Sequence, residues 1–138
     1  MRKAGVAVAA SVAAMAFAAT PATAVAAYPT SDFSIEVGAS YYKGTATWYN
    51  RAVEVNGAFK ATGCRRVYAR AFTGTTSRAF ESSSTWCDRS GPARLGLDVP
   101  VAGGADHVWV YMTDGSQNYL EGMTCYRGYD YCIDGLHH

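Results

Sequence analysis

The stretch Arg65-Arg-Val-Tyr-Ala-Arg-Ala-Phe72 alternates small apolar residues with aromatic or basic residues. Successive side chains of a β-strand point to opposite faces, so this alternation predicts a strand with two very different faces. The small face holds Val67, Ala69 and Ala71 and is predicted to contact the core. The outer face is then predicted to carry Arg66, Tyr68, Arg70 and Phe72.

A second stretch, from His107 to Met112, repeats this pattern with Val108, Val110 and Met112 on one face and His107, Trp109 and Tyr111 on the other. Tyr, Trp and Arg are the residue types enriched at the energetic centres of protein interfaces. The two outer faces therefore predict one exposed surface for partner binding. Its residues are Arg66, Tyr68, Arg70, Phe72, Trp109 and Tyr111. The opposite arrangement, with the aromatic rings in the core, stays open because Ala69 and Ala71 fill little volume.

Short β-branched and aromatic runs recur through the rest of the chain after residue 28, where helical periodicity is nearly absent. Asn56-Gly57 separates two such runs and predicts a tight hairpin turn. Seven or eight short strands in this length indicate an all-β fold, a two-sheet antiparallel β-sandwich of immunoglobulin-like size. A small β-barrel is the alternative.

The first 27 residues predict a secretory signal peptide. Arg2 and Lys3 precede an alanine-rich apolar run that is broken at Pro21 and ends in several small-x-small cleavage sites. Residues 28–40 are predicted to be an extended N-terminal arm or an ordinary first strand. Residues 41–138 are predicted to form the single β-sandwich domain.

The chain without its leader has ten basic and eleven acidic side chains. This balance provides no strong attraction to a polyanion, so a nucleic-acid partner is not expected. No later stretch is long and apolar enough to span a bilayer, so no membrane association is expected after leader cleavage. The predicted location is secreted and extracellular.

Four cysteines in an exported chain predict two disulfides. Of the three possible connectivities, the pairing Cys64–Cys87 with Cys125–Cys132 joins near neighbours along the chain and is favoured. A zinc site is not expected because no His accompanies either pair at ligand spacing.

Catalytic patterns are mostly missing. His107 is the only His in the body of the chain, and its neighbour Asp106 is expected to point to the opposite face, where it could not orient the ring. No nucleophile-elbow motif occurs, and the acids identify no paired carboxylates. A Glu, Arg and His set of the kind used by small ribonucleases can be assembled on paper, but so many Arg and Glu make that match uninformative. The chain is therefore expected to have no enzyme activity, cofactor or metal.

A second tyrosine-rich surface is predicted in the loop closed by Cys125 and Cys132. A short disulfide loop displays its side chains with little ordering cost on binding. Tyr129 and Tyr131 are accordingly further candidates for partner binding, although the loop could equally be a rigid cap. Few amide or carboxylate side chains accompany the aromatic residues, which favours another secreted protein over a carbohydrate as the partner.

The chain has the features of a small secreted two-disulfide β domain with an alanine-rich leader, as in soil actinobacteria. In these features it resembles two groups of proteins. One comprises the proteinaceous α-amylase inhibitors, which present a Trp-Arg-Tyr triplet on a turn. The nearest string here is Trp48-Tyr49-Asn50-Arg51, with a changed order and different cysteine spacing. That resemblance implies an inhibitor of a secreted hydrolase.

The other group is the small adaptor subunit of secreted umbrella toxin particles, which bridges a lectin-like subunit and the toxin-bearing stalk. The mature chain resembles it in size, export, all-β character and an N-terminal arm, and no functional residue is carried over. This resemblance implies an adaptor in a secreted antibacterial toxin complex.

Overall fold

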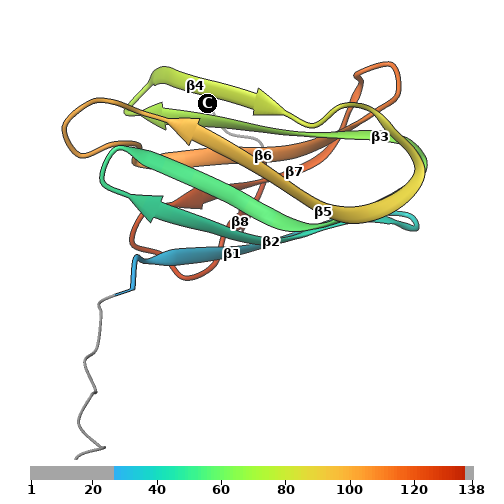
Figure 1. Ribbon diagram of the computed structural model, residues 1–138, viewed down its shortest axis with the longest axis horizontal. Coiled ribbons are helices and arrows are strands. Elements are labelled where there is room, and N and C mark those ends of the chain that lie inside the picture. The colour runs from blue at the N-terminus through green and yellow to red at the C-terminus, as the bar shows by residue number, and fades with distance from the viewer. Residues whose placement is uncertain (1–26, 136–138) are drawn as a thin grey trace, which may run out of the picture.

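The computed structural model describes residues 27–135, which form eight strands joined in one antiparallel sheet (Figure 1). The predicted all-β fold is confirmed, whereas the predicted signal peptide, apart from Ala27, lies outside the described residues. Within residues 27–135 no helix could cross a membrane. The strands are β1 (Thr30–Val37), β2 (Ser40–Tyr49), β3 (Ala52–Thr73), β4 (Thr76–Ser82), β5 (Trp86–Asp98), β6 (His107–Asp114), β7 (Tyr119–Tyr126) and β8 (Ile133–Asp134).

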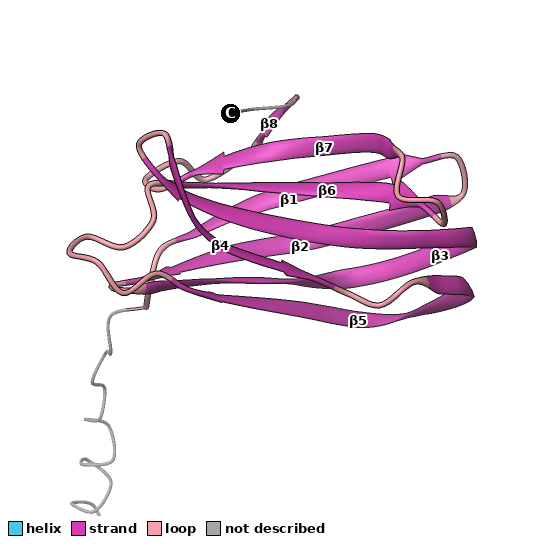
Figure 2. Cartoon of the chain, turned by 90° about the horizontal axis from the view of Figure 1, so that it is seen from above, coloured by secondary structure: helices cyan, strands magenta, loops and turns pink. Residues whose placement is uncertain are grey.

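Strand β3 has 22 residues and belongs to both layers of the molecule. Residues 52–60 pair with β2 on one edge and β5 on the other, whereas residues 65–73 pair with β6 and β4. The register shifts between Ala61 and Cys64, where Gly63 has a φ of +76° that favours glycine. The sheet bends there, so β1, β2 and β5 form one layer while β4, β6 and β7 form the other (Figures 1 and 2).

The sheet nearly closes on itself because β1 meets the segment that follows β7. The amide of Asp32 donates to the carbonyl of Asp130 at 2.8 Å, and the amide of Cys132 donates to the carbonyl of Asp32 at 2.8 Å. The architecture thus lies between the predicted sandwich and its barrel alternative. Of the two readings of residues 28–40, the structure has a strand, β1, at Thr30–Val37.

The predicted hairpin at Asn56-Gly57 is wrong, because both residues lie inside the continuous strand β3. Gly57 pairs with Gly44 of β2, and a Cβ on either glycine would collide with the opposing backbone. The glycine therefore allows a close approach of two strands rather than a turn.

The core lies between the two layers. The face predicted to be buried on β3 and β6 is confirmed, since Val67, Ala69, Ala71, Val108, Val110 and Met112 are fully buried. Larger side chains from β2 and β3 fill the remaining space, among them Tyr42, Trp48 and Phe59. The buried polar groups of Tyr42 and Trp48 are satisfied: the Tyr42 hydroxyl donates to the Ala93 carbonyl, and Trp48 Nε1 donates to Ser31 Oγ, both at 2.9 Å.

Both predicted disulfides are confirmed. Cys64 and Cys87 are directly opposed residues of β3 and β5 just beyond the bend. Cys125 and Cys132 tie the end of β7 to the segment that contacts β1. Two disulfides indicate an oxidising, extracellular-type environment.

Candidate functional site

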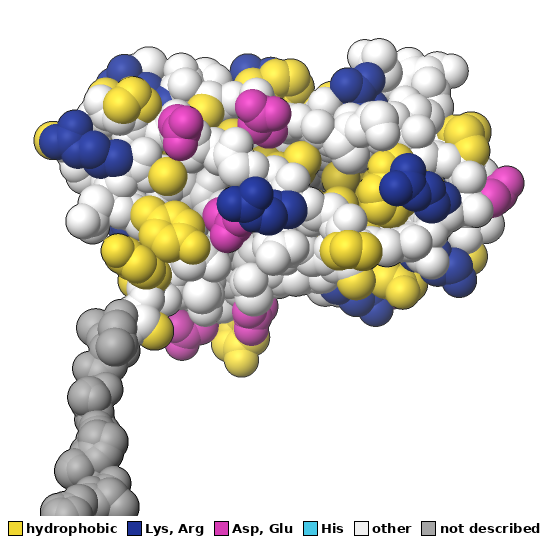
Figure 3. All heavy atoms as spheres, viewed as in Figure 1, with side chains coloured by type: hydrophobic (Ala, Val, Ile, Leu, Met, Phe, Trp, Pro, Cys, Tyr) yellow, Lys and Arg dark blue, Asp and Glu magenta, His cyan; other side chains and the backbone are white. Residues whose placement is uncertain are grey.

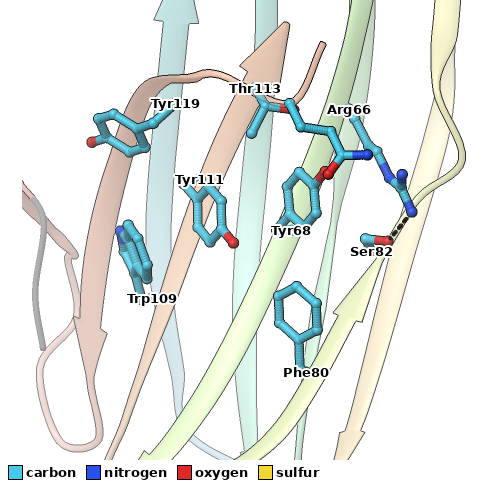
Figure 4. A pocket seen from close by; sticks show the side chains of 9 residues that line it. Arg66, Tyr68, Phe80, Ser82, Trp109, Tyr111, Thr113 and Tyr119 are labelled. Carbon is cyan, nitrogen blue, oxygen red and sulfur yellow. Dashed lines mark hydrogen bonds between the residues drawn. The ribbon is translucent and has the colours of Figure 1, made fainter. Parts of the chain in front are cut away.

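A groove of about 540 Å³ crosses the outer face of the layer that contains β4, β3, β6 and β7 (Figure 4). We call it the aromatic groove. It is lined by Arg66, Tyr68, Phe80, Ser82, Trp109, Tyr111, Thr113, Gln117 and Tyr119.

Strand register explains why these side chains meet. Tyr68 of β3 pairs with Tyr111 of β6, and Arg70 pairs with Trp109. On the other edge of β3, Arg70 also pairs with Phe80 of β4. Paired residues of antiparallel strands project to the same face, so four strands contribute to one surface.

The rings form a stack across the strands. The ring centroids of Trp109 and Tyr111 are 4.1 Å apart, those of Tyr111 and Tyr68 are 4.8 Å apart, and those of Tyr68 and Phe80 are 5.7 Å apart. The Tyr111 and Tyr68 planes differ by only 5°. Tyr68 and Tyr111 therefore each stack against two other rings.

A glycine makes room for the tryptophan. Gly122 of β7 pairs with Tyr111, and a Cβ at this position would lie 3.0 Å from Trp109 Nε1. Trp109 Nε1 is buried and has no hydrogen-bond partner within residues 27–135. The floor of the site thus holds one unsatisfied donor.

Two arginines of β3 are held in fixed positions beside the rings. Arg66 Nε donates to the Ser83 carbonyl at 2.8 Å, and Arg66 Nη2 donates to Ser82 Oγ at 2.9 Å. The Arg70 guanidinium lies 4.3 Å from the centre of the Phe80 ring. In the described part of the chain, neither arginine has a carboxylate within ion-pair distance.

The hydroxyls of Tyr111 and Tyr119 remain protonated at neutral pH, because the pKa of each is raised. Burial raises the pKa of Tyr111, and the charge and hydrogen bond of Arg70 offset part of this effect. Burial also raises the pKa of Tyr119, and the carboxylates of Glu121 and Asp134 raise it further. The groove therefore offers neutral hydroxyl donors. Arg66 lines it on the β3 side, Arg70 lies beside it against Phe80, and the two acids lie near its β7 end.

The predicted exposure of Tyr68 and Phe72 is wrong. Both lie on the predicted outer face, but Tyr68 is only 6% exposed because neighbouring rings cover it. Phe72 is 7% exposed, stacks on His107 and does not line the groove. Trp109, Tyr111, Arg66 and Arg70 are half-buried.

The two tyrosines predicted in the disulfide loop lie elsewhere on the surface. Tyr129 is 62% exposed and Tyr131 is 72% exposed, and neither lines the aromatic groove. They form a separate candidate surface, which we call the tyrosine loop.

The expectation that Asp106 points away from His107 is also wrong. His107 Nδ1 lies 2.5 Å from Asp106 Oδ1, because Asp106 precedes the first residue of β6 and is not bound by strand alternation. His107 is buried, stacks on Phe72 and lies beside Tyr126. The pair is outside the groove, and the part of the chain that the structure describes contains no group of three His, Cys, Asp or Glu side chains suited to a metal ion.

Several groove residues are absent from the sequence prediction: Phe80, Ser82, Thr113, Gln117 and Tyr119. A signal for Phe80 exists, because a turn at Gly74 followed by alternation through Arg78, Phe80 and Ser82 returns the chain alongside β3. Tyr119 reaches the groove through its pairing with Thr113, across an irregular register that no sequence pattern reveals.

Comparison with known proteins adds no assignment. No family model matches the chain, and no curated protein matches it.

Proposed function

We propose that this protein is a small secreted, non-enzymatic protein-binding module that holds another secreted protein in the aromatic groove. One observation carries the proposal: a Trp, three Tyr, a Phe and an Arg line a hollow on the outer face of a sheet. An outward sheet face in a soluble β domain ordinarily carries polar side chains. Aromatic and Arg side chains at this density are typical of protein interfaces.

The ring geometry favours a protein over a carbohydrate. A sugar binds by packing its apolar face on an open aromatic face, but the faces of Tyr68 and Tyr111 are covered by neighbouring rings. Arg70 also covers Phe80. The groove instead presents ring edges, hydroxyls and guanidinium groups, which suit peptide backbone and side chains.

The mixed surface charge agrees with a partner recognised by shape and local contacts. Basic and acidic side chains are interspersed on the face seen in Figure 3. No extended field of one sign is present there to attract a polyanion.

The specific form of the proposal is an adaptor subunit that links components of a secreted antibacterial toxin complex. An adaptor needs two separate surfaces, and the aromatic groove and the tyrosine loop supply two candidates. The disulfides and the predicted leader support export.

A pull-down from the producer's culture medium tests this function. We expect purified residues 28–138 to recover large secreted partners, and Trp109→Ala to weaken recovery about 30-fold, as for a loss of about 2 kcal/mol at an interface centre. Tyr131→Ala is the comparison, because it removes an aromatic ring from the tyrosine loop: it should leave recovery of the groove's partner unchanged and weaken only a partner bound by that loop. Equal recovery by the wild type and Trp109→Ala would contradict a role for the groove.

Thermal melts show whether Trp109→Ala acts through binding or through folding. Trp109 is half-buried on the outer face, so its truncation should cost about 1 kcal/mol, the scale of one aromatic pair. Trp48→Ala is the comparison, because Trp48 is fully buried and its truncation should cost about 3–5 kcal/mol. Near-stoichiometric inhibition of a secreted amylase or protease by the purified protein would favour the inhibitor alternative instead.

A further inference from the structure

We propose that the aromatic groove accepts an extended acidic segment of its partner, with a carboxylate of that segment bound to Arg70, which lies beside the groove against Phe80. This inference rests on the proposed function and adds the chemistry of the occupant. The segment crosses the strands from β4 to β7.

Arg70 is positioned to bind an external carboxylate. Its guanidinium lies against Phe80, and its Nη1 donates to Ser77 Oγ at 3.4 Å. It is also close enough to Tyr111 for its charge to lower the pKa of the Tyr111 hydroxyl, against the larger effect of burial. Among residues 27–135 no carboxylate forms an ion pair with it. A planar guanidinium that is already fixed loses little freedom when it takes a carboxylate in a paired hydrogen-bond geometry.

Arg66 adds to the positive charge on the β3 side of the groove. It lines the groove, its guanidinium lies 5.3 Å from the centre of the Tyr68 ring, and it donates to a serine hydroxyl and a main-chain carbonyl (Figure 4). Within residues 27–135 no carboxylate forms an ion pair with it. The β3–β4 end of the groove is therefore complementary to an acidic side chain.

Two acidic side chains lie near the other end of the groove. Glu121 adjoins Gly122 on β7, and Asp134 of β8 pairs with Met123 of β7. Their carboxylates raise the pKa of Tyr119, which lines the groove at β7, although neither acid lines the groove itself. A uniformly acidic segment would be repelled there, so the segment is expected to be acidic at its β4 end and neutral or basic at its β7 end. This difference fixes the direction in which the segment lies.

The dimensions of the face suit a short extended segment. Strands β4, β3, β6 and β7 are consecutive neighbours, so at about 4.8 Å spacing they span about 14 Å, the length of about four extended residues. The side chains of Tyr68, Tyr111 and Thr113 lie along this path, and their hydroxyls are the hydrogen-bonding groups that the groove offers to such a segment.

A displayed library of random 12-residue peptides, selected on purified residues 28–138, tests the inference. We expect the enriched peptides to share an Asp or Glu followed within about four residues by an apolar side chain. In a synthetic copy of an enriched peptide, replacing that acid by Asn or Gln should weaken binding to the wild-type protein at least 10-fold. This arm does not depend on the folding of any variant.

The protein side of the contact is tested by charge reversal. Arg70→Glu should weaken the acidic peptide by 100-fold or more and should restore binding of a peptide in which Lys replaces the acid. Arg51→Glu is the matched control, because Arg51 is an exposed arginine in the turn between β2 and β3, outside the groove, and should leave binding unchanged.

Three results would overturn the inference: enrichment of basic or uncharged peptides, indifference to the acid in the peptide, or no enrichment at all. The pull-down with Trp109→Ala separates this failure from failure of the proposed function. A secreted partner that needs Trp109 but leaves no acidic peptide signature would retain the function and reject the acidic segment.

Discussion

Gly122 is the residue on which the position of Trp109 depends. A Cβ there would lie 2.8 Å from Tyr111 Cβ and 2.9 Å from the Val110 carbonyl oxygen, in addition to its approach to Trp109. We expect Gly122→Ala to destabilise the fold by about 1–3 kcal/mol through overpacking and to displace the indole. Equilibrium unfolding and tryptophan fluorescence measure the two effects. Gly96→Ala on β5 is the control, because a Cβ there meets nothing within 4 Å and should stabilise by up to about 1 kcal/mol. Equal effects of the two substitutions would contradict the packing argument.

Tyr42 links stability to alkaline pH. Burial raises its pKa far above the usual value of about 10, so the folded state keeps the proton over a range in which the unfolded state loses it. Its contribution to stability is complete below about pH 10 and is lost as the pH rises above that value, at roughly 1.4 kcal/mol per pH unit for one proton. Tyr42→Phe should lose about 1 kcal/mol at neutral pH with the hydrogen bond to Ala93, yet its stability should fall less steeply above pH 10. Urea unfolding of the wild type and of Tyr42→Phe at a series of pH values measures this difference. Equal dependence of stability on pH above pH 10 in the two proteins would disprove the assignment.

The two disulfides stabilise different elements of the fold. Cys64–Cys87 closes a longer loop than Cys125–Cys132, with sequence separations of 23 and 7 residues. On a chain-entropy model the longer loop contributes about 3.5 kcal/mol and the shorter loop about 2.5 kcal/mol. At roughly 4–8 °C per kcal/mol, replacing either pair by alanine should lower the melting temperature by 10 °C or more, and the Cys64/Cys87 pair by the larger amount. Calorimetry of the two double variants measures both, and an unchanged melting temperature for either would contradict this account.

The strands were predictable from sequence where one of their faces is uniformly apolar. Alternation places Val67 and Val108 in the core, and the same pattern places Arg70 and Trp109 on the outer face. The Asn56-Gly57 prediction failed because this dipeptide is found both in hairpin turns and in strands that approach a neighbouring strand closely. Only the position of Gly44, opposite Gly57 on β2, distinguishes the two cases. Local patterns contain no information about that partner.

The groove was predictable only in part for a related reason. Its β3 and β6 residues belong to the two clearest alternating runs, whereas Tyr119 reaches it across a register shift between β6 and β7. The burial of Tyr68 follows from the rings on either side of it. Its exposure is therefore a property of the assembled surface and not of its own strand.

The whole molecule depends on closure between its first strand and its C-terminal segment. The β1 residues Phe33 and Ile35 are buried in the core, and Asp32 bonds the segment that the Cys125–Cys132 bridge holds in place. Strand β1 also pairs along its full length with β2. Its removal would expose both the core and a long unpaired edge of β2.

A chain that starts at Tyr28 should therefore be fully folded, whereas one that starts at Gly38 should not fold. Burying Phe33 and Ile35 alone is worth about 3–6 kcal/mol, which is a large share of the stability of a domain this size. The predicted leader cleavage between Val25 and Tyr28 leaves all of β1 in place. A chain that starts at Tyr28 should therefore have the same melting temperature as one that starts at Val25. Amide exchange and thermal melts of the two truncated chains measure this difference. A cooperative melt and slow exchange in β2 for the chain starting at Gly38 would mean that β1 is a dispensable arm, and that the sheet is stable without closure.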